Sequence, residues 1–289
     1  MNQAPDNRRG VLLMIAATGV LAVQDGLSRH LVVEYSALMV VMIRYWFFLA
    51  FVLAIARRQA GSVRAAARTT QPWLQAGRGV LLAAEIVVSM LAYALLGLIE
   101  THAIFVCYPL IVAALSAPLL GERVGWRRWL AIGAAFTGVL IILQPGSRVF
   151  DPAALIALAA AVMFALYTLM TRHAARRDTA ATSFFWTGAM GALVMTPLGL
   201  WAWEPMAPRD WGFMAALCAT SVAGHWLLIK CYEVAEASAV QPFTYFHLVF
   251  AVLIGVSVFG EVLTWPLVLG AAITVAAGLF ALWRESLQR

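Results

Sequence analysis

Apolar residues in this chain form ten long runs that are separated by short polar links. A helix that crosses a lipid bilayer needs about 20 mainly apolar residues, and each run has close to that length. The pattern therefore predicts an all-α integral membrane protein with ten transmembrane helices. The predicted spans, whose ends are good to about 2–4 residues, are about 10–28, 37–56, 73–97, 101–119, 127–144, 152–171, 182–202, 211–231, 238–258 and 266–283.

A stretch near the end of the first half of the chain is repeated near the end of the second half. Residues 94–143 and 230–282 each contain an apolar segment, a Gly-Glu pair, a tryptophan and a second apolar segment. Ser28-Arg29-His30 and Thr171-Arg172-His173 extend the match toward the front of each half. Because an internal repeat decides the architecture, we expect two five-helix repeats, residues 1–145 and 146–289.

The number of helices in each repeat fixes their relative orientation. Five is odd, so the second repeat enters the membrane from the opposite side, and inverted repeats of this kind are typical of secondary transporters. Cytoplasmic loops carry an excess of basic residues, which places both termini in the cytoplasm. The basic groups on that side are Arg8/Arg9, Arg57/Arg58/Arg64/Arg68, Arg123/Arg127/Arg128, Arg172/Arg176/Arg177 and Arg284/Arg289.

Composition excludes several classes of protein. The chain is 63% hydrophobic and 12% charged, with a mean hydropathy of +0.86, whereas soluble domains are about 25% charged. The net charge of +6 comes mostly from arginines between the apolar runs and does not indicate nucleic acid as a partner. The three cysteines (Cys107, Cys218, Cys231) show no metal-binding spacing, so we expect no disulfide, no metal and no cofactor.

Tryptophans and small residues indicate how the helices sit and pack. Most tryptophans fall at the ends of apolar runs, which predicts an interfacial aromatic belt. They are Trp73, Trp126, Trp129, Trp201, Trp203, Trp211, Trp265 and Trp283. Helices five and ten carry Gly133-x-x-x-Thr137 and Gly270-x-x-x-Thr274, a spacing that lets helices approach closely. This packing could join two helices of one chain or two chains, so a monomer and a homodimer both remain possible.

At this point the chain resembles a known group of transporters. The matching residues are Arg44 within ALMVVMIRYWFFLAF, Tyr108-Pro109-Leu110, Gly121-Glu122-Arg123 and, in the second half, AEASAVQPFTYFHLVFAVLIGVSVFGEVLTW. They resemble the EamA-type, ten-helix branch of the drug/metabolite transporter superfamily, most of all the aromatic amino acid exporters of the YddG type. The resemblance implies proton-driven export of small metabolites, commonly amino acids. Leu248 stands where the first half has Pro109, which puts a matching kink in helices four and nine in doubt.

Ionisable groups within the spans are the candidates for transport chemistry. Each costs about 2.5–3.5 kcal/mol to insert and so needs a reason to be there; they are Asp25, Arg44, Glu85, His225, Lys230 and His247. Glu85, Ser89 and Tyr93 are spaced four apart and share one helix face. Glu85 is the predicted proton carrier, because burial favours the protonated form of a carboxyl group; the alternative is a paired structural carboxylate, for example with Arg44. Asp25 is expected near a helix end, where water reaches it.

Aromatic and polar residues complete the predicted site. Arg44 could hold a substrate carboxylate through a bidentate contact or reach the membrane interface. For the others, the alternative role is packing or hydrogen bonding between helices. The predicted substrate-binding residues are Arg44, Tyr45, Ser89, Tyr93, Trp186, His225, Tyr245 and His247.

The predicted function is a proton-linked secondary exporter of small amphipathic metabolites, with amino acids, including aromatic ones, as the predicted substrates. Other small metabolites or drugs are the alternative, and lipid and small molecules are the expected partners. Phosphorylated sugars would need several convergent cations, and the chain has one lysine and few arginines away from its loops. An intramembrane enzyme would need a nucleophile or metal motif, and the sequence shows none. A non-transporting scaffold would not need ionisable groups inside its spans.

Overall fold

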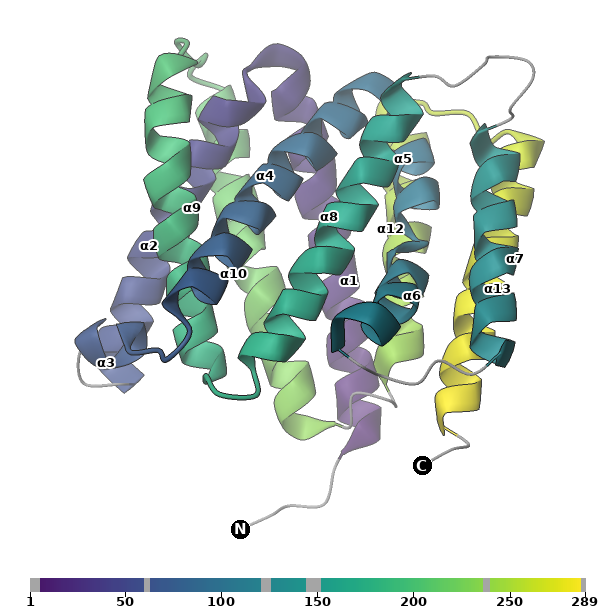
Figure 1. Cartoon of the computed structure of the whole chain (residues 1–289). Helices are drawn as coiled ribbons and strands as arrows, with labels where there is room; N and C mark the ends of the chain where they lie inside the picture. Colours follow the sequence, from purple (N-terminus) through teal and green to yellow (C-terminus); the bar gives the residue numbers. More distant parts are fainter. Residues whose placement is uncertain (1–5, 60–62, 121–125, 144–151, 236–239, 287–289) are drawn as a thin grey trace.

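The structure is a computed structural model that describes residues 6–59, 63–120, 126–143, 152–235 and 240–286. All of its secondary structure in these ranges is helical (Figure 1). The helices are α1 (Asn7–Glu34), α2 (Ala37–Gln59), α3 (Val63–Ala67), α4 (Pro72–Leu96), α5 (Leu98–Phe105), α6 (Tyr108–Leu120), α7 (Trp126–Leu143), α8 (Pro152–Ala174), α9 (Ala180–Trp201), α10 (Asp210–Val234), the 3₁₀ helix η1 (Gln241–Tyr245), α12 (Phe246–Phe259) and α13 (Trp265–Ser286).

These helices form the ten predicted apolar segments. In the described part of the chain, six helices are long and apolar enough to cross a membrane, and four further apolar segments are shorter. Two of the ten segments are interrupted helices, α5–α6 and η1–α12. The short α3 lies in the link between α2 and α4 and was not predicted. Helix α1 runs on to Glu34, six residues beyond its predicted end, which changes the depth of every side chain near that end.

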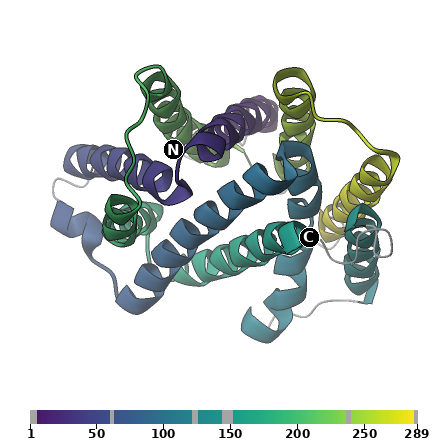
Figure 2. The same ribbon diagram turned by 90° about the horizontal axis from the view of Figure 1, so that it is seen from above.

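Helix packing in one half is matched by equivalent packing in the other. Helix α1 packs against α10 and α12, and its counterpart α8 packs against α4 and the α5–α6 segment. Helices α2 and α9, which are counterparts, pack against each other, and so do α7 and α13. Seen from above, α4 and α8 lie side by side, and the α7–α13 pair lies at one side of the bundle (Figure 2). An inverted repeat produces this exchange of partners.

The α7–α13 pair explains one of the small-residue motifs. A Cβ atom added to Gly138 would lie 2.5 Å from the Thr274 hydroxyl and 2.6 Å from the carbonyl oxygen of Gly270, so the two backbones touch. Gly270-x-x-x-Thr274 therefore serves packing within the chain. Gly133 has open space around its Cα, and the exposed Thr137 hydroxyl bonds only to the Gly133 carbonyl.

Both interrupted helices break at equivalent positions. Helix α5 ends at Phe105 and α6 begins at Tyr108, while η1 gives way to α12 between Tyr245 and Phe246. With the Gly-Glu pairs aligned, these breaks fall on the same place in each repeat. The kink is therefore present in both halves, although only the first half has a proline there. A 3₁₀ stretch inside a helix often marks a functional hinge.

A contact between the halves stabilises the start of α5. Gly97 adopts φ +86°, a backbone conformation that favours glycine. The Glu261 carboxylate accepts hydrogen bonds from the backbone N–H groups of Leu98 (2.7 Å) and Ile99 (2.8 Å) and forms an ion pair with Arg29. A carboxylate is favourable there because the N-terminus of a helix carries partial positive charge. This contact joins α1 and α5 of the first half to the α12–α13 turn.

Two further sequence predictions concern helix ends. Gly260 ends α12 with φ +65°, in the left-handed conformation expected of a C-terminal glycine, whereas Gly121 and Glu122 lie outside the described residues. All eight tryptophans predicted for the interfacial belt are exposed, as lipid-facing anchors should be.

Candidate functional site

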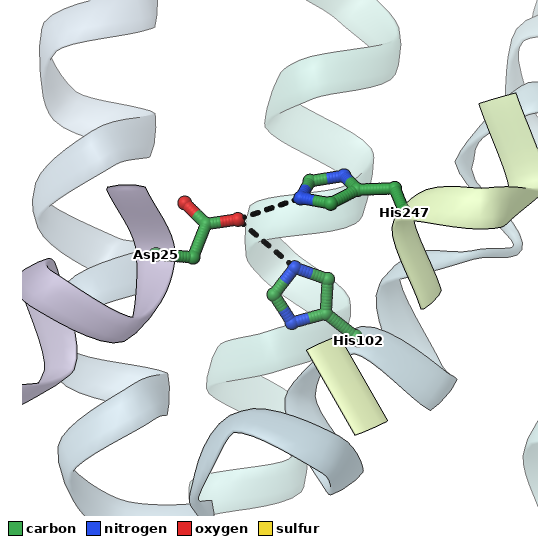
Figure 3. A group of neighbouring side chains, drawn as sticks. All are labelled: Asp25, His102 and His247. Carbon is green, nitrogen blue, oxygen red and sulfur yellow. Dashed lines mark hydrogen bonds and ion pairs between the residues drawn. The ribbon is translucent and has the colours of Figure 1, made fainter. Parts of the chain in front are cut away.

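Three ionisable side chains from three helices meet inside the bundle. Asp25 of α1 faces His102 of α5 and His247 of α12, whose rings lie next to each other (Figure 3). Its Oδ2 atom is 3.1 Å from Nε2 of His102 and 2.9 Å from Nε2 of His247. Asp25 and His102 are buried, and His247 is half-buried. We call these three residues the Asp-His-His cluster.

The interruptions of the helices position this cluster. Helix α5 starts afresh after Gly97, so His102 does not follow the helical register of α4. Its Nδ1 atom lies 2.9 Å from the carbonyl oxygen of Leu98, which fixes the ring. Tyr93, near the end of α4, stacks on this ring with centroids 5.5 Å apart and planes 3° apart. His247 lies at the first turn of α12, directly after the 3₁₀ segment.

The predicted stripe on the third span lies next to the cluster. Glu85 is 4% exposed, and it accepts a hydrogen bond from the Ser89 hydroxyl at 2.7 Å. The charge of Arg44 acts on Glu85 and on His225, and the charge of Asp25 also acts on Glu85. No ion pair or hydrogen bond of the half-buried Arg44 guanidinium occurs within the described residues. Arg44 and Glu85 are thus neighbours but not partners, which leaves the guanidinium available to an anionic group.

Two predicted tyrosines lie in helix packing. The ring of Tyr45 rests against Gly191 of α9, and the ring of Tyr245 rests against Gly278 of α13. Both hydroxyls are buried without a hydrogen-bond partner in the described part of the chain. The Asp-His-His cluster together with Glu85, Ser89 and Tyr93 is called the central group below. We therefore place neither Tyr45 nor Tyr245 in the central group.

Trp186 and His225 are also held by neighbouring side chains and backbone. The indole nitrogen of Trp186 donates to the carbonyl oxygen of Ala67 in α3 at 3.1 Å, away from the cluster. His225 lies against the rings of Phe48 (5.8 Å) and Phe184 (6.0 Å) and faces the side of the site that holds Arg44. His225 therefore lies at the edge of the central group, whereas Trp186 does not belong to it.

One member of the central cluster was not selected from the sequence, and another was misplaced. His102 belongs to the same repeat segment as Pro109 but lies after the Gly97 break, so helical spacing from Tyr93 did not point to it. Asp25 was expected near a wet helix end, yet it is 7% exposed. The reason is the length of α1: nine residues separate Asp25 from Glu34, about 13 Å along a helix.

A buried arginine joins three helices by hydrogen bonds at one end of the bundle. This residue was also not selected from the sequence. Arg78 is 1% exposed and lies near the start of α4, at the end where α1 begins and α13 ends (Figure 1). Its guanidinium donates to Gln75 Oε1 (2.9 Å) in α4 and to the Tyr167 hydroxyl (3.2 Å) in α8. It also donates to Ser183 and to the Thr187 hydroxyl (2.9 Å) in α9. We call these residues the Arg78 network.

Polar contacts also join the two halves at the opposite end of the bundle. The Tyr35 hydroxyl donates to Asp210 Oδ2 at 2.7 Å, and Glu204 accepts from the backbone N–H of Ser36. The Arg29–Glu261 ion pair lies on the same side. Each of these contacts joins a residue of the first half to one of the second, so the halves are bonded to each other at both ends of their interface.

Ten apolar helices, with ionisable groups buried where the two halves meet, are the architecture of a membrane transport protein. The chain belongs to the EamA-like transporter family, whose profile matches residues 8–144 and again residues 151–283. The chain is accordingly a multi-pass membrane protein and a secondary transporter, not an enzyme.

Similar proteins have transporter names of several kinds. The chain is 32% identical over 223 residues to a riboflavin transporter of Rhizobium johnstonii, covering 76% of this chain and 74% of that protein. It is 34% identical over 183 residues to a riboflavin transporter of Vibrio cholerae (62% and 60%). It is 21% identical over 280 residues to an S-adenosylmethionine uptake transporter of Rickettsia prowazekii (96% and 93%). One solved structure, 18% identical, shares the fold with a TM-score of 0.64 over 96% of this chain and 98% of that chain.

These names correct part of the expectation from the sequence. The family assignment is confirmed, but the relatives are riboflavin and S-adenosylmethionine transporters, not aromatic amino acid exporters of the YddG type. They also include uptake systems, so the resemblance to exporters does not fix the direction of transport.

Proposed function

We propose that this protein carries a planar, nitrogen-containing heteroaromatic metabolite of the riboflavin class across the bacterial inner membrane by alternating access. Its two inverted halves are residues 1–145 and 146–289, both termini are cytoplasmic, and the monomer is the transporting unit. The Asp-His-His cluster with its stacked Tyr93 is the observation that carries this proposal, because it lies at the junction of the halves.

The chemistry of the central group suits such a substrate. A flavin ring has a broad apolar face and an edge of carbonyl and N–H groups, so it needs an aromatic surface and fixed polar partners. Tyr93 and His102 offer stacked rings, while the side-chain oxygens of Asp25, Glu85 and Ser89 offer acceptors beside them. The relatives of Rhizobium johnstonii and Vibrio cholerae, at 32% and 34% identity, are named riboflavin transporters, which supports the same class of substrate.

The contacts at the two ends support alternating access. The Arg78 network and the Arg29–Glu261 pair both join the halves, one at each end of the bundle. Opening toward either side then requires one set of contacts to separate while the other holds. The hinge positions would be the interruptions in α5–α6 and η1–α12.

Amino acids, including aromatic ones, are the second candidate substrates. The observation in their favour is Arg44, whose guanidinium has no partner among the described residues and lies beside the central group. A free guanidinium can bind a substrate carboxylate with two parallel hydrogen bonds, and riboflavin has no carboxylate.

Transport by purified protein in liposomes tests the proposal. Labelled riboflavin, S-adenosylmethionine and tryptophan are compared, and we expect saturable riboflavin uptake. Tyr93→Leu removes the stacking ring, worth about 0.5–1.5 kcal/mol, and should raise KM for riboflavin roughly 3- to 10-fold. Ser257→Ala, on the exposed face of α12, is the matched control and should leave KM unchanged. Transport of tryptophan without riboflavin would establish the second candidate in its place.

A further inference from the structure

Hydrogen-bond geometry at His102 requires one more proton than a neutral ring supplies. The Nδ1 atom lies 2.9 Å from the carbonyl oxygen of Leu98, which can only accept, so Nδ1 carries the hydrogen. A neutral imidazole then has a lone pair on Nε2. That atom lies 3.1 Å from Oδ2 of Asp25, which in a carboxylate is also an acceptor. The contact is a hydrogen bond only if an additional proton lies between the two atoms.

The other histidine does not raise this difficulty. His247 Nε2 is 2.9 Å from the same oxygen, and a neutral ring with its hydrogen on Nε2 donates there. With His102 charged, Asp25 ionised and His247 neutral, the cluster has zero net charge and both contacts are made. If the additional proton leaves, a buried negative charge remains with one imidazole donor. The Tyr93 hydroxyl, which also interacts with the Asp25 side chain, and Gln24, at 3.5 Å from Oδ1, are weak substitutes.

Within the described residues, the positive charges that act on Asp25 belong to its two histidines. Every helix packed on α1 carries titratable or charged groups. They are Arg44 (α2), Glu85 and Tyr93 (α4), His102 (α5), Cys218 and His225 (α10), Tyr245 (η1) and His247 (α12). The groups whose positive charge acts on Asp25 are His102 and His247, whereas Arg44 acts on Glu85 and His225. The charge balance of Asp25 therefore depends on its two histidines.

We propose that the Asp-His-His cluster is the proton-coupling site of the transporter and that one proton, shared by His102 and Asp25, is bound and released in each cycle. This inference rests on the proposed transport function and goes beyond it by naming the carrier. The proton enters from water on one side of the membrane and leaves to water on the other. Release breaks the bond between α1 and α5, both in the first half, and leaves the full negative charge of Asp25 facing His247 in α12 of the other half. Proton binding thus changes the strength of a contact between the halves, which links it to their arrangement.

The same geometry separates this site from Glu85. The Glu85 carboxyl group already receives a donor from Ser89 and has Arg44 nearby. Its hydrogen bond is complete without an additional proton. Glu85 thus serves in the substrate pocket in this proposal, and the sequence-based role of proton carrier passes to the cluster.

Two transport measurements test the inference with labelled riboflavin in liposomes. In gradient-driven transport, one coupled proton changes the accumulation ratio about tenfold per pH unit, since each unit is worth about 1.4 kcal/mol. His102→Gln keeps an amide N–H toward Asp25 but cannot bind the proton. We expect it to lose the gradient dependence and to retain riboflavin exchange at equal pH, and Asp25→Asn to lose the gradient dependence as well.

Matched variants make the result specific. His225 has the same Nδ1 contact to a carbonyl four residues earlier, Ser221 at 2.8 Å. No carboxylate lies against its other nitrogen in the described residues. His225→Gln and Glu85→Gln should therefore keep the tenfold dependence, whatever their effect on KM. If His102→Gln keeps it, or if Glu85→Gln alone loses it, the cluster is not the coupling site.

Two further measurements test the inference independently of the substrate and against the alternative of a bound metal ion. Titration of the protein in detergent, between about pH 5 and about pH 9, where histidine titrates, should show one more proton bound by wild type than by His102→Gln. This count needs no substrate, so it stands if riboflavin is not transported, and equal counts overturn the proposal. One carboxylate and two imidazoles are also zinc ligands. Transport that EDTA abolishes and Zn²⁺ restores would make the cluster a metal site and overturn proton coupling.

Discussion

Replacing the buried Arg78 with methionine should destabilise the protein by a calculable amount. Methionine has nearly the length of arginine but no donors, so the change removes the hydrogen bonds with little change in volume. The Gln75 Oε1 atom then loses both of its donor contacts (2.9 and 3.2 Å), and the Tyr167 hydroxyl loses its contact with the guanidinium (3.2 Å). The hydroxyls of Thr171 and Thr187 keep their bonds to carbonyls four residues earlier.

Two polar groups, the buried Gln75 Oε1 atom and the half-buried Tyr167 hydroxyl, therefore lose their partner. Each costs about 1–3 kcal/mol, and the relief from no longer burying a guanidinium offsets part of this sum. We expect the free energy of unfolding of Arg78→Met to fall by about 3 kcal/mol. At about 2–4 °C per kcal/mol for a chain of 150–250 residues, the midpoint of thermal unfolding falls by roughly 6–12 °C.

The cysteines provide a direct assay for this change. All three are free and buried, so a dye that fluoresces on reaction with thiols reports unfolding in detergent. Arg57→Met, at an exposed position near the end of α2, is the matched control and should stay within about 0.5 kcal/mol of wild type. If Arg78→Met unfolds at the temperature of the control, the Arg78 network does not hold the halves together and this reasoning fails.

Three further predictions use the same assay. Gly138→Leu should lower stability by at least about 1–3 kcal/mol through overpacking at the α7–α13 contact, while Gly133→Leu, with open space at its Cα, should have little effect; equal effects would contradict the assigned helix faces. Glu261→Gln weakens charge-assisted hydrogen bonds at the start of α5 and should lower the free energy of unfolding by about 1–2 kcal/mol. Glu34→Gln, at an exposed position, is its control and should change it little. Tyr45→Phe removes a buried hydroxyl without a partner and should stabilise the protein by about 1 kcal/mol; a loss of stability would reveal a partner for it.

The helices could be predicted from the sequence because the thickness of the bilayer sets their length. The repeat also indicated which helices are counterparts, and the structure shows that counterpart contacts recur. Helix ends were less predictable: α1 continues through the polar Arg29, whose guanidinium pairs with Glu261, and ends at the exposed Glu34. The symmetric helix breaks do not depend on Pro109 alone, since the second half breaks with Leu248 in the same place.

The candidate site was predictable only where it lies on one helix. Glu85, Ser89 and Tyr93 share a face, and helical spacing was enough to group them. Asp25 meets His102 and His247 across 77 and 222 positions of the chain. No local pattern encodes such a meeting. Trp186 was predicted to bind the substrate, but its indole nitrogen bonds to a carbonyl group of α3 instead. The lengths of apolar runs do not reveal a helix as short as α3.

The cap of α5 has a consequence for how this protein is made. The backbone N–H of Leu98 bonds to Glu261, a residue 163 positions later in the chain. At about 5–20 residues per second, a ribosome delivers Glu261 roughly 8–33 seconds after Leu98. During that interval α5 waits in the membrane with its N-terminal amides uncapped. The first half reaches its final form only when the last hairpin has been inserted, so truncated chains should be recognised as unfinished by membrane quality control.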